Sequence, residues 1–136
     1  MAAADANAWR FSCEYSDITT PGHHATARDL AILARRLTQE FPEYYPFSNQ
    51  QQFSYRTFHK VNKNKLLVQD PTVDGLKTGH TNAAGWCIIA TAKRVEPVTG
   101  SSRRIFAVLL GAPTEKLRIS GAHELIELGF KQPVHK

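Results

Sequence analysis

The sequence of 136 residues contains no long run of apolar residues. A helix needs about 20 consecutive apolar residues to cross a bilayer, so we expect no membrane-spanning helix. The first ten residues, MAAADANAWR, lack the basic segment followed by an apolar core that marks a secretory signal peptide, so no export signal is visible. The length is that of one domain, and the 42% apolar content is typical of a globular fold.

Cysteine is scarce, and residues with metal-ligand spacing are lacking. The two cysteines, Cys13 and Cys87, form no CxxC motif, which disfavours a zinc or dithiol redox site. We expect Cys87, in the apolar run GWCIIATA, to be a buried thiol, while the sequence leaves open whether the two cysteines pair. The histidines are too scattered for a ligand cluster: His23, His24, His59, His80, His123 and His135. The sequence therefore predicts neither a metal site nor a cofactor.

Strong charge of either sign is also missing. The net charge is +5, from 17 basic and 12 acidic residues. This mild excess fits contact with an anionic surface such as a cell wall, phospholipid or nucleic acid, but an ordinary solvated surface is the favoured interpretation. The basic residues are spread out and form no aromatic-interleaved motif of the nucleic-acid-binding kind, so we expect no nucleic-acid partner.

One helix is clearly indicated in the first half of the chain. Residues 1–25 are expected to be irregular, because several turn-forming residues precede position 26. Thr26 and Asp29 form a capping-box pattern, and Pro42 follows the predicted end at Glu40. The expected apolar face follows helical spacing through Leu30, Leu33, Ala34, Leu37 and Phe41.

The remaining segments predict strands, turns and a final helix. The predicted elements are a strand at 53–58, a turn at 62–65, a short strand or helical turn at 66–68, strands at 73–78, 86–93 and 104–111, and a helix from 113–115 to Leu128. The four residues from Asn82 to Gly85 are expected to form a hairpin connection. The final helix is expected to turn Leu117, Gly121, Leu125 and Leu128 inward and to end before Gly129. The fold class is therefore α+β, an antiparallel sheet flanked by helices, with a helix on one face as the simplest arrangement.

A Lys-Thr-Gly triplet, Lys77 to Gly79, lies at the end of one predicted strand. A cationic side chain beside a hydroxyl can bind a peptide carboxylate through charge-assisted hydrogen bonds. Glycine leaves room for an extended peptide to lie along the strand edge, and the next backbone N–H can face a developing oxyanion. The triplet alone also fits an ordinary surface turn, so its context decides the interpretation.

That context resembles the serine-type D-alanyl-D-alanine carboxypeptidases, the low-molecular-mass penicillin-binding proteins. The resemblance covers residues 21–131, through ATARDLAILARRLTQEFPEYYPF, NKNKLLVQDPTVDGLKTGHTNAAGWCIIATAKR, FAVLLGAPTEKLR and LIELGF. It implies part of a β-lactamase/penicillin-binding transpeptidase-like fold. Within that fold, residues 26–131 are the C-terminal part of the catalytic domain, residues 1–25 an irregular segment, and residues 132–136 a tail.

The resemblance also assigns roles. It implies that Lys77 and Thr78 recognise the substrate carboxylate, that Gly79 leaves room for the substrate, and that the backbone N–H of His80 completes the oxyanion hole. Asp74-Gly75 and the start of the first helix, with His23, match structural positions. The implied partners are peptidoglycan peptides ending in D-Ala-D-Ala, and β-lactams. The implied location is periplasmic or extracytoplasmic.

The sequence also departs from the family pattern. No serine has a lysine three residues later, so no nucleophile is found, and no S-x-N motif is present. The T-x-x-K string from Thr57 to Lys60 is out of the family order. Two hypotheses remain: an enzyme that trims pentapeptides through an acyl-enzyme, or a non-catalytic remnant or binding module. In either case we expect exposed apolar surface, on the sheet or on the helix that ends at Glu40, to make the isolated chain either self-associating or marginally stable.

Overall fold

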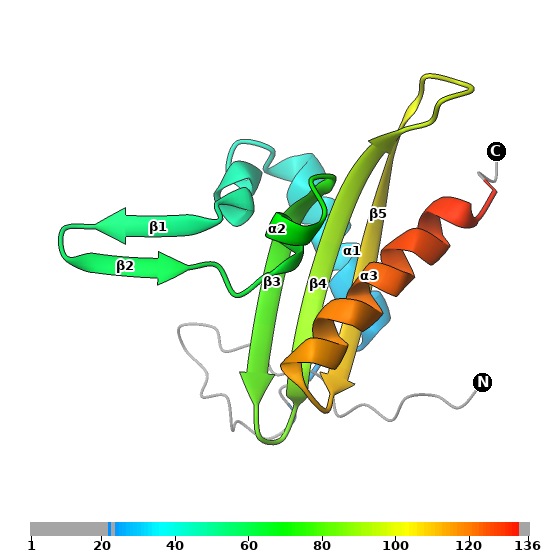
Figure 1. The fold of residues 1–136 in the computed structure, drawn as a ribbon. Coiled ribbons are helices and arrows are strands. Elements are labelled where there is room, and N and C mark those ends of the chain that lie inside the picture. The colour runs from blue at the N-terminus through cyan, green and yellow to red at the C-terminus, as the bar shows by residue number, and fades with distance from the viewer. Residues whose placement is uncertain (1–21, 23, 134–136) are drawn as a thin grey trace.

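The computed structural model describes residue 22 and residues 24–133. The elements follow the order α1 (Ala27–Glu40), η1 (Tyr45–Asn49), β1 (Gln52–Tyr55), β2 (Phe58–Val61), α2 (Leu66–Gln69), β3 (Val73–Thr81), β4 (Gly85–Val95), β5 (Ser102–Ala112) and α3 (Glu115–Lys131) (Figure 1). Strands β3, β4 and β5 form an antiparallel sheet in that order, and β1 and β2 form a separate hairpin. The α+β class is confirmed.

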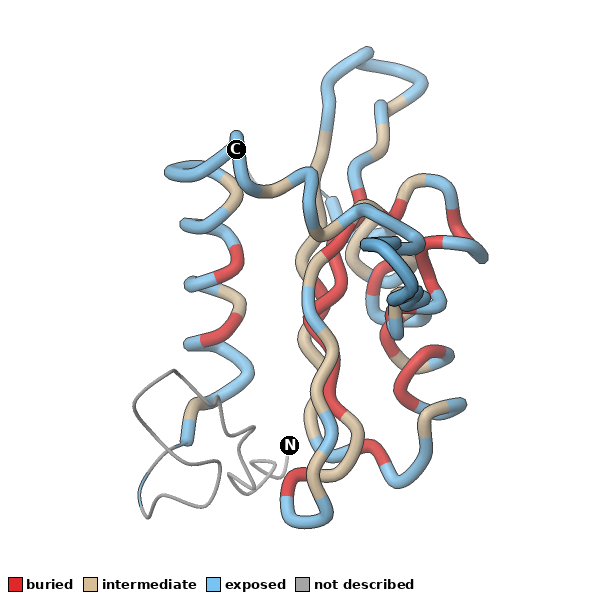
Figure 2. The backbone as a smooth tube through the Cα atoms, turned by 90° about the vertical axis from the view of Figure 1, so that its left-hand side faces the viewer, coloured by how far each residue is buried: buried red, intermediate tan, exposed pale blue. Residues whose placement is uncertain are grey.

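Helices cover both faces of the three-stranded sheet, as Figure 2 shows with the sheet seen edge-on. Alternate residues of β4 point to opposite faces, as in any strand. Ile88 and Ala90 join the core beneath α3, together with Ile126. Cys87 and Ile89 join the core beneath α1. The expectation of a helix on one face was therefore incomplete, because α1 occupies the other.

The start of α1 follows the predicted capping box. The hydroxyl of Thr26 accepts a hydrogen bond from the Asp29 backbone N–H, and the Asp29 carboxylate accepts one from the Thr26 backbone N–H. These contacts satisfy amides that the first turn leaves without helical partners. The apolar face is covered only in part, because Leu33 and Leu37 remain exposed although Leu30 and Ala34 on the same face are buried. The described chain thus leaves part of this face open.

The inner face predicted for α3 was wrong for its three leucines. Leu117, Leu125 and Leu128 are exposed, and the buried residues are Arg118, Ile119, Ala122 and Ile126. The helix carries two apolar rows side by side, and sequence spacing could not decide between them. Gly121, the fourth residue predicted to face inward, does approach the sheet, since a Cβ there would lie 2.7 Å from Leu109 Cδ1. This close approach and the small Ala122 beside it bring that side of the helix against the sheet.

Three further details differ from expectation. The helix continues past Gly129 to Lys131, so Gly129 lies within it. There, a Cβ would meet Ile105 Cγ2 at 2.8 Å, so the glycine serves close helix–sheet contact instead of ending the helix. The strand expected at 53–58 is split into β1 and β2 by a turn at Arg56 and Thr57. Residues 66–69 form the helical turn α2.

Several sequence predictions concern residues outside the described part of the chain, among them Cys13, His23 and His135. The buried position of Cys87 is confirmed. The division of the chain at residues 25/26 and 131/132 stays a prediction. In the described residues, no helix is both long enough and apolar enough to cross a membrane.

Candidate functional site: the Lys-Thr-Gly edge of the sheet

The Lys-Thr-Gly triplet lies on β3, an edge strand whose only partner strand among the described residues is β4. Lys77 is opposite Ile89, and Thr78 is opposite Ile88. Ile89 belongs to the core under α1, whereas Ile88 belongs to the core under α3. Because paired residues share a face, the two side chains lie on opposite faces. They can contact one ligand together only at the outer edge of β3.

Lys77 has an electrostatic environment that disfavours its charge. Much of the residue is exposed, but neighbouring protein atoms desolvate the ammonium group. This desolvation and the positive charges of Lys63 and Arg118 lower the pKa of Lys77. Its Nζ donates a hydrogen bond to the carbonyl of Thr78. Three cations thus surround one end of β3, an arrangement that favours an anionic ligand.

Arg118 lies almost fully buried in α3, with a relative exposure of 1%. One amino group, Nη1, contacts the Gly79 carbonyl at 3.5 Å, and the other, Nη2, contacts the Lys63 carbonyl at 3.4 Å. The guanidinium also lies 5.0 Å from the centroid of the Trp86 ring. Its Nε has no hydrogen-bond partner among the described residues. Burial lowers the pKa of Arg118, although Glu115 nearby opposes this effect.

An apolar groove adjoins Lys77 on the α1 side of the sheet. It has a volume of about 380 Å³ and is lined by Leu33, Ala34, Leu37, Tyr44, Tyr45, Phe47, Ser48, Leu76, Lys77 and Ile89. The exposed leucines of α1 therefore lie beside the ammonium-bearing residue of the triplet. The groove extends the candidate site from the strand edge onto the α1 face.

A polar network fixes the start of β3. Arg104 on β5 holds Asp74 with both amino groups, at 2.7 Å and 2.9 Å. The same guanidinium donates to the hydroxyls of Tyr45 and Thr91 at 2.8 Å and 2.9 Å. The Tyr45 hydroxyl in turn donates to Asp74. Burial, and then the Asp74 carboxylate, raise the pKa of Tyr45. These contacts give Asp74 a structural role next to the triplet.

His80 and Trp86 form the far end of the site. They are opposite one another in the β3–β4 pairing, and their rings lie 4.0 Å apart between centroids. The ring of His80 thus packs against the ring of Trp86, whereas the oxyanion prediction concerns the backbone N–H of His80. That prediction, and the roles of Lys77, Thr78 and Gly79, remain to be tested. Thr57 of the T-x-x-K string lies in the turn between β1 and β2.

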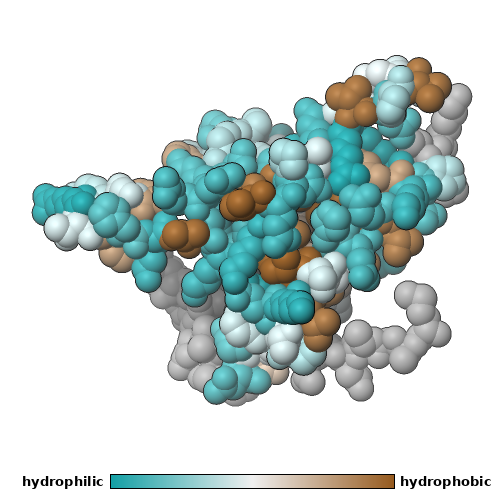
Figure 3. Space-filling view, in the orientation of Figure 1, coloured by the Kyte–Doolittle hydropathy of each residue, from teal (hydrophilic) through white to brown (hydrophobic). Residues whose placement is uncertain are grey.

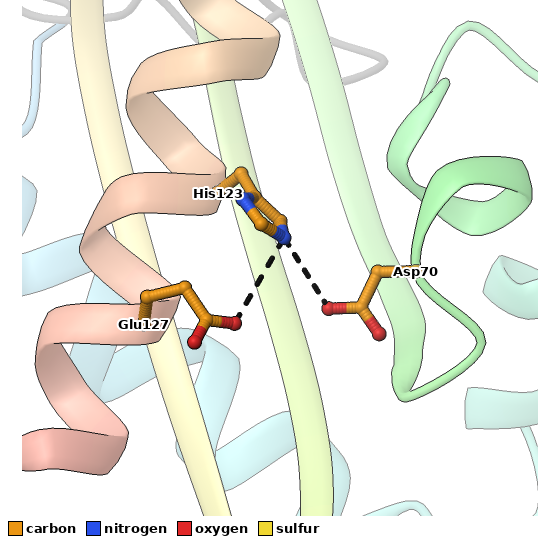
Figure 4. A group of neighbouring side chains, drawn as sticks. All are labelled: Asp70, His123 and Glu127. Carbon is orange, nitrogen blue, oxygen red and sulfur yellow. Dashed lines mark ion pairs between the residues drawn. The ribbon is translucent and has the colours of Figure 1, made fainter.

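Asp70, His123 and Glu127 form a second cluster of ionisable side chains (Figure 4). His123 Nε2 lies 3.7 Å from Asp70 Oδ2 and 3.8 Å from Glu127 Oε1. The same two oxygens are held by Arg94 Nη2, at 2.9 Å and 2.5 Å. Because one guanidinium already bridges both carboxylates, this cluster is an ion-pair network that ties α3 to β4 and to the end of α2. It is not a preformed cation site.

Sequence reasoning missed Lys63 and Arg118 at the site. Neither belongs to the triplet, and Arg118 is 39 residues from Gly79 in the chain. A signal was present, because Arg118 follows the helix start at Thr114 by one turn and interrupts an apolar pattern. Only the packing of α3 across the sheet shows that this turn lies at the end of β3 (Figure 1).

Comparison of the sequence with known proteins finds one family and several of its curated members. Residues 13–114 match the family described as D-alanyl-D-alanine carboxypeptidase. D-alanyl-D-alanine carboxypeptidase DacC of Escherichia coli is 34% identical over 115 residues, which are 84% of this chain and 27% of that protein. DacF of Bacillus subtilis is 32% identical over 124 residues, 85% of this chain and 29% of that protein.

Solved structures show the same similarity. Penicillin-binding protein 5 of Haemophilus influenzae has a TM-score of 0.73 and 33% identity, over 82% of this chain and 31% of that one. Penicillin-binding protein D2 of Listeria monocytogenes, in its cefotaxime-bound form, has a TM-score of 0.69 and 32% identity, over 82% of this chain and 44% of that one. The chain spans between a quarter and a third of the length of the curated relatives, 27% to 29% for the two named above. The chain belongs to the S11 peptidase family of D-alanyl-D-alanine carboxypeptidases.

Proposed function

We propose that this chain carries the substrate-recognising strand of a serine-type D-alanyl-D-alanine carboxypeptidase. The observation that carries the proposal is the position of Lys77, Thr78 and Gly79 on the outer edge of β3, with two further cations close by. The ligand is a peptidoglycan stem peptide ending in D-Ala-D-Ala, whose terminal carboxylate is the charge that such a site attracts. The place of action is outside the cytoplasmic membrane.

Each residue of the strand has a distinct role in this proposal. Lys77 and Thr78 reach the carboxylate from opposite faces of the strand, one as a cation and one as a hydroxyl donor. Gly79 lets the peptide backbone approach the strand edge, as an added strand would. The backbone N–H of His80 stabilises the oxyanion that forms when the scissile carbonyl is attacked. Arg118 supports these groups by holding the carbonyls of Gly79 and Lys63.

The reaction proceeds through an acyl-enzyme. A serine hydroxyl attacks the carbonyl of the penultimate D-Ala, its proton passes to a base, and the terminal D-Ala leaves with a proton as a free amino acid. Water then hydrolyses the ester. No Ser-x-x-Lys motif occurs in the 136 residues, so nucleophile and base come from sequence outside them. β-Lactams are ligands of the same site, in line with the cefotaxime-bound structure of a relative.

A second candidate function is a non-catalytic binding module. The missing Ser-x-x-Lys motif favours it for the chain taken alone. Such a module keeps the carboxylate-binding edge of β3 and performs no covalent step. The two candidates predict the same non-covalent binding by this chain and differ in whether sequence outside these 136 residues supplies a nucleophile for acylation.

The test combines a covalent and a non-covalent probe. A fluorescent penicillin is incubated with the folded chain and read on a denaturing gel beside a full-length relative, and no covalent band is expected from this chain. An N-acylated D-Ala-D-Ala peptide is then titrated by NMR, with its C-terminal amide as the uncharged control. Binding of the acid but not of the amide, lost in Thr78→Val, supports the site. Equal binding of both peptides would overturn it, and a covalent band would reveal a nucleophile within these residues.

A further inference from the structure

The β1–β2 hairpin protrudes from the body of the protein, as Figures 1 and 3 show. All eight of its strand residues are exposed. A two-stranded hairpin without a packed face is marginally stable on its own. Apolar side chains on such a hairpin are not buried in the core, so they do not stabilise the fold by burial and need another explanation.

The side chains on this hairpin are sorted by face. Phe53 pairs with Lys60, and Tyr55 pairs with Phe58, so these four share one face, called here the aromatic face. Its three rings have exposed fractions of 52%, 60% and 51%. The opposite face carries Gln52, Ser54, His59 and Val61. There, His59 Nδ1 lies 2.8 Å from the Ser54 hydroxyl, so this face is mainly polar.

Cations lie against the rings of the aromatic face. The Arg56 guanidinium, in the turn, is 5.3 Å from the centroid of the Tyr55 ring. Lys60 Nζ is 5.7 Å from the centroid of the Phe58 ring. Exposed contacts of this kind are weak, so an anionic ligand can draw the cations aside without a large cost. Rings and cations are therefore available to one ligand together.

The hairpin has a net positive charge. Residues 52–61 contain Arg56 and Lys60 and not one aspartate or glutamate, whereas Lys65, beyond the base of the hairpin, is already paired with Glu115. Charge complementarity therefore selects an anionic ligand. At about 3.4 Å per residue, the four-residue strands make a ribbon only roughly 14 Å long. A ribbon of this length is too small to supply the ~800 Å² of surface that each partner of a stable protein complex buries. The face fits a narrow chain with flat apolar surfaces better than a folded partner.

The base of the hairpin is tied to the candidate site. The Asn62 N–H donates to the Gln51 carbonyl at 2.8 Å, and Asn64 Nδ2 donates to the Gly75 carbonyl on β3 at 3.0 Å. The carbonyl of Lys63 accepts from Arg118. These contacts anchor the base of the hairpin beside β3, so a polymer bound at the aromatic face can extend toward the candidate site.

We infer that the aromatic face of the β1–β2 hairpin binds the glycan strand of peptidoglycan, with the sugar rings stacked on Phe53, Tyr55 and Phe58 and the carboxylates of the attached stem peptides paired with Arg56 and Lys60. Pyranose rings present apolar C–H faces that match flat aromatic rings. The inference rests on the proposed function in one respect, namely that the peptide ends of the same polymer occupy β3. The hairpin then contributes affinity for the polymer that short soluble peptides do not receive.

The test is co-sedimentation of the full chain with insoluble peptidoglycan from which a carboxypeptidase has first removed the terminal D-Ala residues. Binding to the hairpin survives this treatment, whereas binding through D-Ala-D-Ala ends does not. The double variant Phe53→Ser/Tyr55→Ser is expected to lower the affinity about tenfold, as for the loss of aromatic anchors elsewhere. Val61→Ser, which also removes an exposed apolar side chain but from the opposite face, is the matched control and is expected to bind like the wild type.

Circular dichroism establishes that the double variant keeps its fold, as expected for residues that pack against no core. Wild-type affinity in the folded double variant would overturn the inference. So would binding that occurs only to untreated peptidoglycan, is lost in Lys77→Met and is unaffected by the hairpin changes, an outcome that would still support the proposed function. Binding to anionic phosphatidylglycerol vesicles in place of peptidoglycan would make the hairpin a membrane contact and would also overturn it.

Discussion

Replacement of Arg118 by methionine separates ligand binding from stability. A buried guanidinium is costly, and the exchange of such a charge for a similar apolar side chain is often neutral or stabilising. Its hydrogen bonds are long, between 3.2 Å and 3.5 Å. The surface carboxylate of Glu115 keeps Lys65 as a partner at 2.9 Å, so the change strands no charge. We expect the free energy of unfolding to change by no more than about 1 kcal/mol.

The same change is expected to weaken carboxylate binding. Arg118 contributes positive charge at the end of β3 and holds the carbonyls of Gly79 and Lys63. Its loss is expected to reduce the affinity for an N-acylated D-Ala-D-Ala peptide about tenfold, or about 1.4 kcal/mol. Its charge also helps to lower the pKa of Lys77, so that pKa is expected to rise in the variant. Peptide titration, NMR titration of the Lys77 side chain and urea unfolding measure the three quantities.

Arg103→Met is the matched control. Arg103 donates to the carbonyls of Gly129 and Gln132 at 2.9 Å and 2.7 Å, so it stabilises the C-terminal end of α3, away from the triplet. We expect it to lose about 1–2 kcal/mol of stability, with peptide affinity unchanged. If Arg118→Met instead lost more than about 3 kcal/mol, or left both the affinity and the pKa of Lys77 unchanged, the positioning role would be refuted.

Three further predictions concern stability and association. Gly85→Ala is expected to lower the free energy of unfolding by about 2–4 kcal/mol, because φ is +67° and a Cβ would lie 3.0 Å from the Ala112 carbonyl. Gly100→Ala, at the same φ but in open space, is expected to lower it by about 1 kcal/mol. Urea unfolding compares the two variants, and equal losses would refute the clash at Gly85. Burial opposes ionisation of Asp70, but hydrogen bonds from a hydroxyl, an amide and a guanidinium outweigh it and lower its pKa. The stabilisation by ionised Asp70 is present above its unfolded pKa of about 3.9 and is lost as pH falls through its lower folded pKa. Asp70→Asn is therefore expected to lower the free energy of unfolding by about 2 kcal/mol at neutral pH and to make it depend less on pH in acid. An unchanged dependence on pH in acid would contradict this. Leu33→Lys/Leu37→Lys is expected to reduce self-association in sedimentation velocity, and an equally associated variant would place the contact elsewhere.

Local signals determined much of the fold. The capping box at Thr26 predicted the start of α1 to within one residue, because the cap is a contact between neighbours in the chain. The long β-branched and apolar runs predicted β4 and β5 in the same way. The triplet from Lys77 to Gly79 was likewise visible, since it is contiguous in sequence and lies on one strand.

Tertiary structure alone decided which faces these elements bury and which distant residues meet. The sequence of α3 offers two apolar rows, and the close approach to β5 selects the one with Ala122 and Ile126. The same choice turns Arg118 toward Gly79, so the missed residue of the site and the mistaken face of the helix have one cause. Helical periodicity states how side chains repeat around an axis, whereas the rotation of that axis against the sheet depends on packing between segments far apart in the chain.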